Sequence, residues 1–287
     1  MMSDSLDRQD WQAILAAVPA KAVTTAKHGR LSFRQAGSGD APPLVLLHGI
    51  GSGSGSFAFI LNSLARHYRV IAWDAPGYGD SDTLAKPDPT PADYAEALVD
   101  LLNTLCLPKV LLLGHSLGAL IGGAFAAAHP ERVDRLILAC TAHGHARLAT
   151  DDRKGKLAAR LEAFERLGPE AHAAERAHRL LGPEAAENAK ALGRFNMARL
   201  RTDGYKAAAH CLSVGDLLDD CARITAPTLV IAGGADNVTP PAACRAVADA
   251  IGHGTACMEI PGAGHACYVD RPDAFLRIVL DFLGEAK

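Results

Sequence analysis

Short runs of apolar residues alternate along the chain with longer segments in which apolar residues recur at helical spacing. A short apolar run is typical of a strand buried on both faces, and helical spacing is typical of a helix that covers a sheet. The alternation predicts an α/β fold with a mostly parallel, doubly wound sheet. The predicted strands lie at 31–35, 44–47, 70–73, 110–113, 136–139, 228–232 and 257–260, and the predicted helices near 56–66, 91–105, 117–129, 241–251 and 272–284.

The alternation stops once, between about residues 142 and 215. This segment is rich in Ala, Arg, Glu and Leu, and only Gly168-Pro169 and Gly182-Pro183 interrupt its helical pattern. Helices inserted here are expected to lie over the carboxyl ends of the parallel strands, where open α/β sheets bind ligands. The sequence therefore predicts a core of residues 1–141 and 216–287 and a helical cap of residues 142–215. The alternative is that the extra helices pack elsewhere on the core.

Composition and charge narrow the function classes. The 287 residues are 49% hydrophobic and 21% charged, which is typical of an ordered globular chain. The net charge of −3 argues against nucleic-acid binding, which usually requires a basic face, and no G-x-x-x-x-G-K-[ST] phosphate loop is present. We therefore expect a small molecule as the binding partner.

The cysteines and the amino terminus indicate a reducing compartment. Seven cysteines are scattered along the chain without C-x-x-C spacing, a pattern that predicts buried free thiols and no zinc site or disulfide framework. The first residues are acidic and lack the basic and apolar regions of a leader, and no apolar run reaches the about 18 residues of a membrane span. We expect a cytoplasmic protein with no membrane partner. A homodimer is left open.

The pentapeptide Gly114-His115-Ser116-Leu117-Gly118 is the first candidate for chemistry. It lies between a predicted buried strand and a segment rich in helix formers, which is the strand–turn–helix context of a nucleophile elbow. The two glycines allow the tight turn that exposes the Ser116 hydroxyl. Outside this context, such a pattern is often a serine in an ordinary loop. The context favours a nucleophilic serine.

A serine nucleophile needs a base and an acid that orients the base, and on this architecture the chain order is serine, acid, histidine. Asp236 follows the predicted strand at 228–232, and His265 lies in a glycine-rich loop after the strand at 257–260. Taken singly, Asp236 is also a good turn residue and His265 could be an exposed loop histidine. Their occurrence at strand ends in the required order predicts a Ser116–His265–Asp236 triad.

Acyl transfer by a serine also needs two backbone N–H groups for the developing oxyanion. Leu117, directly after the nucleophile, is one candidate donor. The other is Ile50 in the glycine- and serine-rich loop that starts at His48, directly after a predicted buried strand. A flexible linker is not expected at this place, and the loop lacks the G-x-G-x-x-G spacing of a dinucleotide site.

These motifs resemble those of the α/β-hydrolase fold superfamily, and the resemblance covers the chain from about residue 30. The matching segments are 48–51 (HGIG), 73–81 (WDAPGYGDS) and 114–118 (GHSLG), together with Asp236 and His265. The resemblance implies a serine hydrolase without cofactor or metal, with an acyl-enzyme intermediate. Haloalkane dehalogenases and epoxide hydrolases are excluded because they use an aspartate where this chain has Ser116. Asp74 is expected to belong to a structural turn.

Within the superfamily, the sequence is similar to the 3-oxoadipate enol-lactonases of aromatic compound degradation and to the C–C hydrolases of meta-cleavage products. The segment 203–211 (DGYKAAAHC), followed by Asp216, is similar to the lactonase group. The C–C hydrolases typically carry proline where this chain has Ser52, which weakens that alternative. A hydrolase fold that binds a ligand without catalysis is a further alternative. The leading hypothesis is an esterase or (enol-)lactonase.

The charge of the predicted cap suggests an anionic substrate. Residues 142–215 contain 13 lysine and arginine residues against 9 aspartate and glutamate residues, whereas the whole chain is acidic. A basic cap would steer and pair with a carboxylate-bearing substrate, although lysine and arginine on helices mostly form solvated faces. Arg147 and Arg199 are the candidate charged contacts, and Phe195 and Met197 are candidates for the apolar wall or for packing between cap and core.

Overall fold

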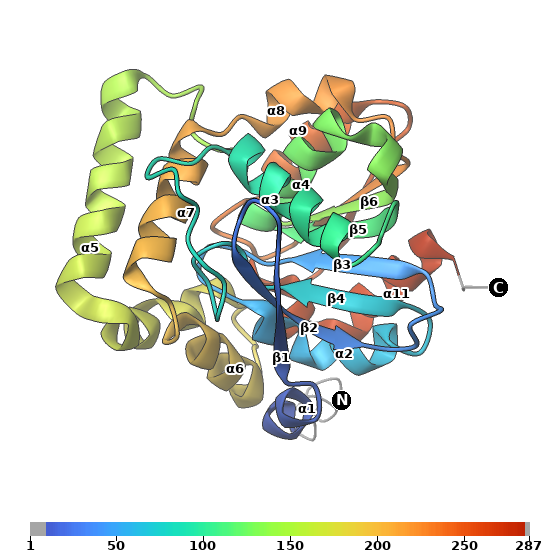
Figure 1. Cartoon of the computed structure of the whole chain (residues 1–287). Coiled ribbons are helices and arrows are strands. Elements are labelled where there is room, and N and C mark those ends of the chain that lie inside the picture. Colours follow the sequence, from blue (N-terminus) through green and yellow to red (C-terminus); the bar gives the residue numbers. More distant parts are fainter. Residues whose placement is uncertain (1–9, 285–287) are drawn as a thin grey trace.

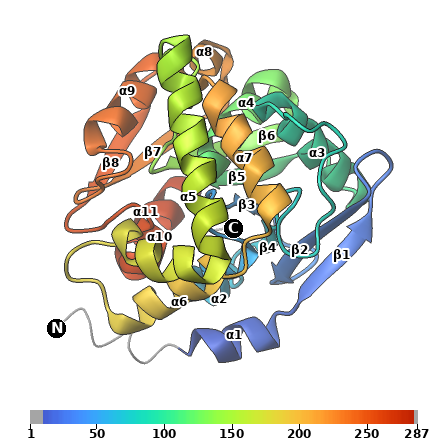
Figure 2. The same cartoon turned by 90° about the vertical axis from the view of Figure 1, so that its left-hand side faces the viewer.

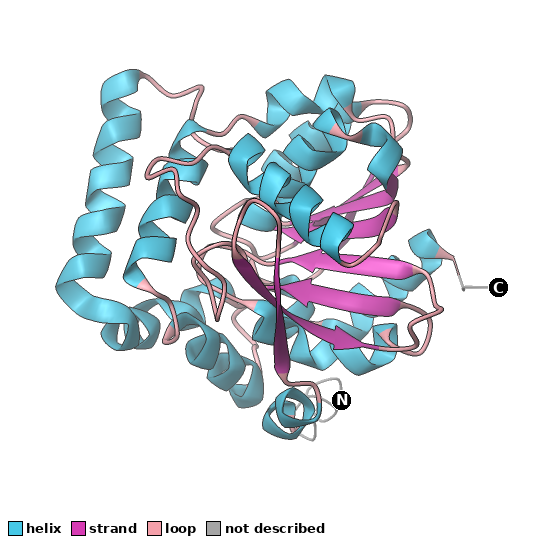
Figure 3. Cartoon of the chain, in the orientation of Figure 1, coloured by secondary structure: helices cyan, strands magenta, loops and turns pink. Residues whose placement is uncertain are grey.

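The computed structural model describes residues 10–284, and its strands form one eight-stranded sheet in the order β1-β2-β4-β3-β5-β6-β7-β8 (Figures 1 and 3). β2 pairs antiparallel with β1 and β4, and all other neighbours are parallel. The predicted mostly parallel sheet is confirmed. The strands are β1 (Ala20–Thr24), β2 (Arg30–Ala36), β3 (Pro43–Leu47), β4 (Arg69–Trp73), β5 (Val110–His115), β6 (Val133–Ala139), β7 (Thr228–Gly233) and β8 (Ala256–Ile260).

Helices cover both faces of this sheet. Successive side chains of β3 enter opposite cores: Val45 belongs to the core with α3, α4 and α9, and Leu46 to the core with α2 and α11. The helices of the two layers are α2 (Ala58–Leu64), α3 (Pro91–Thr104), α4 (Leu117–Ala128), α9 (Pro241–Ile251) and α11 (Pro272–Leu283). All five were predicted from the sequence. Shorter helices are α1 (Trp11–Ala17), α8 (Leu217–Asp220) and α10 (Cys267–Asp270), and 3-10 turns are η1 (Ser54–Phe57), η2 (Pro130–Arg132) and η4 (Cys221–Arg223).

β1 and α1 were not predicted from the sequence. β1 is an edge strand in which no residue is fully buried, so its sequence shows no regular apolar alternation. Its position depends on the antiparallel pairing with β2. Helix α1 has seven residues and buries only Trp11 and Leu15, too few positions for a helical period to be recognised.

Residues 142–215, all of them described, contain three helices and no strand. These are α5 (Thr150–Arg176), α6 (Glu187–Met197) and α7 (Thr202–Val214), with the 3-10 turn η3 (Ala177–Leu180) between the first two. They stand in front of the carboxyl ends of the parallel strands (Figure 2). We refer to residues 142–215 as the cap. α5 is bent where Gly168 adopts φ 69° and Pro169 follows, so its two arms point in different directions.

All seven cysteines are free, and five of them are buried. Cys106 is exposed because it lies in the turn after α3, and Cys257 is half-buried on the edge strand β8, so the prediction of buried thiols fails at these two positions. Within residues 10–284, no helix is long and apolar enough to span a membrane.

Asp74, directly after β4, connects three segments of the core. Its carboxylate is buried and accepts hydrogen bonds from the Ser32 hydroxyl and the Ser54 N–H, both at 2.8 Å. The Ser54 contact anchors the loop that follows β3, and the Ser32 contact holds β2. Asp74 therefore stabilises the loop that carries Ile50, as expected of a structural turn residue.

Replacing Asp74 with alanine should destabilise the fold. The substitution leaves the buried hydroxyl of Ser32 and the N–H of Ser54 without their acceptor, at a cost of about 2 kcal/mol or more in the free energy of unfolding. Urea unfolding measures this loss, with Asp40→Ala as the control because Asp40 is exposed. Equal stability of the two variants would contradict this account of Asp74.

Candidate active site

Ser116 lies at a sharp turn between β5 and α4, with φ 55° and ψ −114°. Non-glycine residues seldom adopt this conformation, and such strain is typical of functional sites. The turn depends on close backbone contacts: a Cβ at Gly114 would lie 2.3 Å from the carbonyl oxygen of Gly118, and a Cβ at Gly118 would lie 2.1 Å from that of Leu47. Only glycine fits at these two positions.

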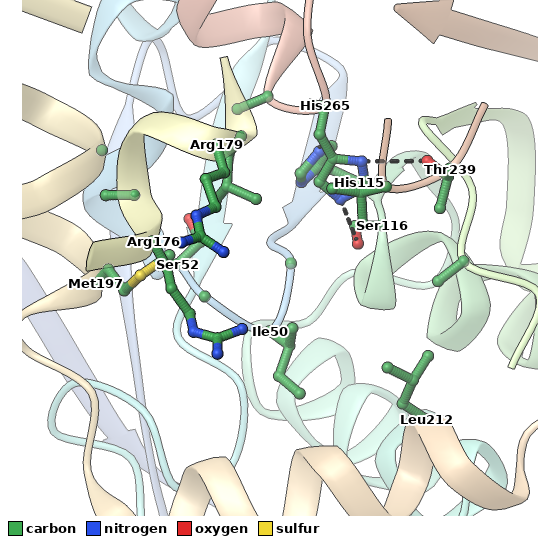
Figure 4. A pocket seen from close by; sticks show the side chains of 18 of the residues that line it. Ile50, Ser52, His115, Ser116, Arg176, Arg179, Met197, Leu212, Thr239 and His265 are labelled. Atoms are coloured by element: carbon green, nitrogen blue, oxygen red, sulfur yellow. Dashed lines mark hydrogen bonds between the residues drawn. The ribbon is translucent and has the colours of Figure 1, made fainter. Parts of the chain in front are cut away.

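Ser116, His265 and Asp236 form a continuous hydrogen-bonded chain. His265 Nε2 lies 2.8 Å from Ser116 Oγ (Figure 4). On the other side of the ring, His265 Nδ1 lies 2.8 Å from Asp236 Oδ2. All three residues are buried. The fold thus brings together side chains from the ends of β5, β7 and β8, as the sequence predicted.

The environment of Asp236 keeps its carboxylate ionised. Burial alone would raise the pKa of Asp236, but hydrogen bonds from His265 and Thr239 outweigh this effect and lower the pKa to about 2. Oδ1 accepts the N–H groups of Val238 and Thr239, and Oδ2 accepts the Thr239 hydroxyl at 2.7 Å. An ionised Asp236 holds the proton of His265 on Nδ1, which leaves Nε2 free to accept the serine proton.

Two residues at the site were not assigned a role from the sequence. Thr239 Oγ1 donates to Asp236 and also lies 3.1 Å from His265 Nδ1. His115 Nε2 donates to the carbonyl oxygen of His265 at 2.9 Å, and burial lowers the pKa of His115 to about 3, so its ring is neutral. His115 thus supports the loop of the base. Its position beside Ser116 in the pentapeptide was the one signal in the sequence.

The loop after β3 lies against the nucleophile. A Cβ at Gly49 would lie 3.1 Å from Ser116 Cβ, so the chain passes close to the hydroxyl. His48 fixes the loop because its Nδ1 donates to Gly49 O at 2.8 Å and its Nε2 accepts the Ala75 N–H at 3.0 Å. Burial lowers the pKa of His48, which agrees with this neutral form. The Tyr78 hydroxyl holds the carbonyl of Ile50 at 2.9 Å.

The His265 loop is joined to the cap through the buried carboxylate of Asp270. Asp270 Oδ2 accepts the N–H of Gly264, in the His265 loop, and the N–H of Gly182, in the cap, at 2.8 and 2.7 Å. A direct bond from the Ala266 N–H to the Leu180 carbonyl, at 2.7 Å, lies beside them. His265 is therefore positioned by cap and core together.

Ser116 and His265 open into a cavity of about 740 Å³ between the core loops and the cap. Ile50 and Met197 are among its lining residues. Its charged lining residues come from the cap and are Lys156, Arg160, Arg176 and Arg179.

Three of the predicted substrate contacts do not line this cavity. Arg147 is exposed and its Nε pairs with Asp216 at 2.8 Å. Phe195 is half-buried and packs between cap and core, with its ring 4.8 Å from that of Trp11. The guanidinium of Arg199 lies over the Phe195 ring at 5.2 Å. The helical pattern did not reveal which side of the cap faces the core, so the cations selected from the sequence lie outside the cavity.

A group of possible metal ligands also lies here. Within residues 10–284, His115, Cys140 and His265 have ligand atoms within 4.8 Å of one another. Both ring nitrogens of His265 are already occupied by Ser116 and Asp236. The hydrogen bonding therefore fits the serine chemistry and gives no reason to assign a metal.

Comparison with known proteins agrees with this geometry. The model of the alpha/beta hydrolase fold family matches residues 42–272. The chain is 32% identical over 268 residues to a protein of Klebsiella pneumoniae called putative carbamate hydrolase RutD, covering 88% of this chain and 96% of that protein. It is 31% identical to the pimeloyl-[acyl-carrier protein] methyl ester esterase of Chromobacterium violaceum, covering 85% and 95%.

Among solved structures, the enol-lactonase of Burkholderia xenovorans superimposes with a TM-score of 0.81 and 28% identity, covering 92% of this chain and 99% of that one. The match extends over nearly the whole length of both chains and thus includes the cap.

The low pKa of Asp236 predicts acid-dependent stability. Because the folded pKa of about 2 lies below the unfolded value of about 4, ionised Asp236 stabilises the fold above about pH 4, and this contribution disappears as the pH falls to about 2. Urea unfolding should show the wild type more stable than Asp236→Asn by about 2 kcal/mol at pH 7, with a gap of about half that at pH 3. A gap independent of pH would contradict the assignment.

Proposed function

The chain belongs to the α/β-hydrolase fold family and is a hydrolase of that fold, and we propose that it cleaves a carboxylic ester or (enol-)lactone through Ser116, His265 and Asp236. The observation that supports this proposal most directly is the pair of 2.8 Å contacts that join the serine hydroxyl to the imidazole and the imidazole to the carboxylate. Nucleophile, base and orienting acid then stand in one hydrogen-bonded line.

The reaction proceeds in two steps. His265 Nε2 takes the proton of Ser116 as Oγ attacks the acyl carbonyl, and the same nitrogen returns the proton to the leaving alcohol or enol oxygen. Ser116 now carries the acyl group. Water, deprotonated by His265, attacks this acyl-enzyme and releases the acid. Asp236 stays ionised throughout and stabilises the imidazolium that forms in each step.

The oxyanion is held by the N–H groups of Ile50 and Leu117. Leu117 is the first residue of α4, where helical N–H groups lack intrahelical partners and the helix dipole is positive. The bond from Tyr78 to the Ile50 carbonyl fixes the peptide that follows the close approach of Gly49 to Ser116. Donors fixed in advance stabilise the transition state without reorganising.

The substrate is a small, carboxylate-bearing molecule. The similar proteins are named for a carbamate, a methyl ester and an enol-lactone, and each of these groups presents an acyl carbonyl to a nucleophile. The cavity of about 740 Å³ lies in the size range of small-molecule sites. Its charged lining residues are all cations.

Replacing Ser116 with alanine should abolish hydrolysis of p-nitrophenyl acetate and labelling by a fluorophosphonate probe, because it removes the hydroxyl that His265 Nε2 contacts. Asp236→Asn should retain the fold and lower kcat by a factor on the order of 10³–10⁴, since His265 loses the partner that sets its tautomer. Labelling of the folded alanine variant, or absence of labelling in the wild type, would overturn the proposal.

A substrate series separates the bond types. We expect turnover of an enol-lactone or of small methyl esters, measured by proton release, and none of a C–C bond in a dienoate made by meta-cleavage. Hydrolysis of the C–C bond of the dienoate by the wild type, lost in Ser116→Ala, would assign C–C hydrolysis to the same triad. Dependence of all activities on Ser116 is the control.

A further inference from the structure

Four cations of the cap line the cavity, and none of its lining residues, all of which are described, is an aspartate or glutamate. Lys156 and Arg160 come from the first arm of α5, before the bend at Gly168, whereas Arg176 ends α5 and Arg179 lies in η3. The bend in α5 thus lets both arms contribute to one wall. Figure 4 shows the guanidinium groups of Arg176 and Arg179 pointing into the cavity, across from Ser116 and His265.

Two buried polar atoms of this wall have no hydrogen-bond partner within residues 10–284. These are His172 Nδ1 and Arg176 Nε. His172 is only 4% exposed, and its ring lies edge-on to those of Phe164 and Tyr205, with centroids at 5.0 and 5.7 Å. Buried polar atoms are usually satisfied, and leaving one unpaired costs about 1–3 kcal/mol. Both residues line the cavity, so the wall beside these atoms is polar and incompletely hydrogen-bonded.

The charge of the wall is poorly neutralised. Burial and the nearby charges of Arg176 and Arg160 lower the pKa of His172 to about 4, so this histidine is neutral between two guanidinium groups. The neighbouring carboxylate is that of Glu175, whose Oε1 lies 3.8 Å from Arg176 and 3.7 Å from Arg179. Both contacts are long for charge-assisted hydrogen bonds. The Glu175 carboxylate therefore neutralises the charges of Arg176 and Arg179 only weakly.

We propose that Arg160, His172, Arg176 and Arg179, together called the cap anion site, bind a dianionic part of the substrate, either two carboxylates or one phosphate. This inference rests on the proposed function, because it places the anion opposite Ser116 in the same cavity. A single carboxylate leaves most of the charge of the three arginines uncompensated. A second negative charge pairs with the remaining guanidinium groups, and the neutral ring of His172 lines the cavity beside them.

Calorimetry on the wild-type protein tests the charge requirement without any need for catalysis. We titrate succinate, inorganic phosphate and acetate at pH 7.5 and low ionic strength. One of the two dianions should bind at least about tenfold more tightly than acetate, the size of one additional charge-assisted contact. Tighter binding of succinate identifies two carboxylates, and tighter binding of phosphate identifies a phosphate group. Equal affinities for all three anions would overturn the proposal.

Variants place the binding in the cap anion site. Arg176→Gln and Arg160→Gln should each weaken dianion binding about tenfold. Arg179→Gln repeats the test at a position exposed enough not to disturb folding. Arg166→Gln is the matched control, an exposed arginine of the same helix that does not line the cavity. Thermal unfolding verifies that each variant folds. Undiminished binding in the three site variants would refute this location.

The outcome is separable from that of the proposed function. Ser116-dependent hydrolysis without selective dianion binding leaves the serine hydrolase in place and rejects the cap anion site. Selective dianion binding without any hydrolysis supports the cap anion site and rejects the serine hydrolase. The two results are independent because calorimetry does not require turnover.

Discussion

The site depends on the close approach of helix α4 to strand β3. The backbone at Gly118 passes so near Leu47 that no Cβ fits between them, and Gly114 meets Gly118 in the same way. With these contacts made, the chain between them has to turn sharply, and Ser116 takes up the strained conformation that the turn requires. The packed sheet and helix on either side maintain the strain. The serine is thus presented by the core of the fold and not by a flexible loop.

His265 is held in a different way, by hydrogen bonds to its buried polar groups. His265 bonds to Asp236 and Ser116 through its ring and to His115 through its carbonyl, and its loop is tied to Asp270. Asp270 also holds the cap at Gly182. Because the Asp270 carboxylate accepts hydrogen bonds from both segments, the cap and the His265 loop are held together. This arrangement fixes the cap at Gly182 relative to the loop that carries His265.

Particular residues show where reasoning from the sequence succeeds and where it fails. Asp236 follows the buried strand β7 and His265 follows the edge strand β8, and the topology of a parallel sheet brings strand ends together, so their proximity to Ser116 was predictable. Thr239 was not assigned because its contribution depends on a side-chain orientation within a turn. Arg147 and Arg199 were selected by charge alone, whereas the bend at Gly168 aims Arg160 and Arg176 at the cavity. Edge strand β1 was not predicted because none of its residues is fully buried.

The sequence by itself determined the sheet apart from β1, the helical insertion, and the chain order of Ser116, Asp236 and His265 at strand ends, because strands and tight turns leave local patterns of apolar residues and glycine. Only the tertiary structure decided which cations of the cap face the serine, since exposed arginines on a helix look alike until a bend and a packing partner orient them. It also decided that His172 and Arg176 keep unpaired polar atoms in the cavity wall. Polar atoms are left unpaired where segments that are distant in the sequence pack together, and no local sequence pattern records such packing.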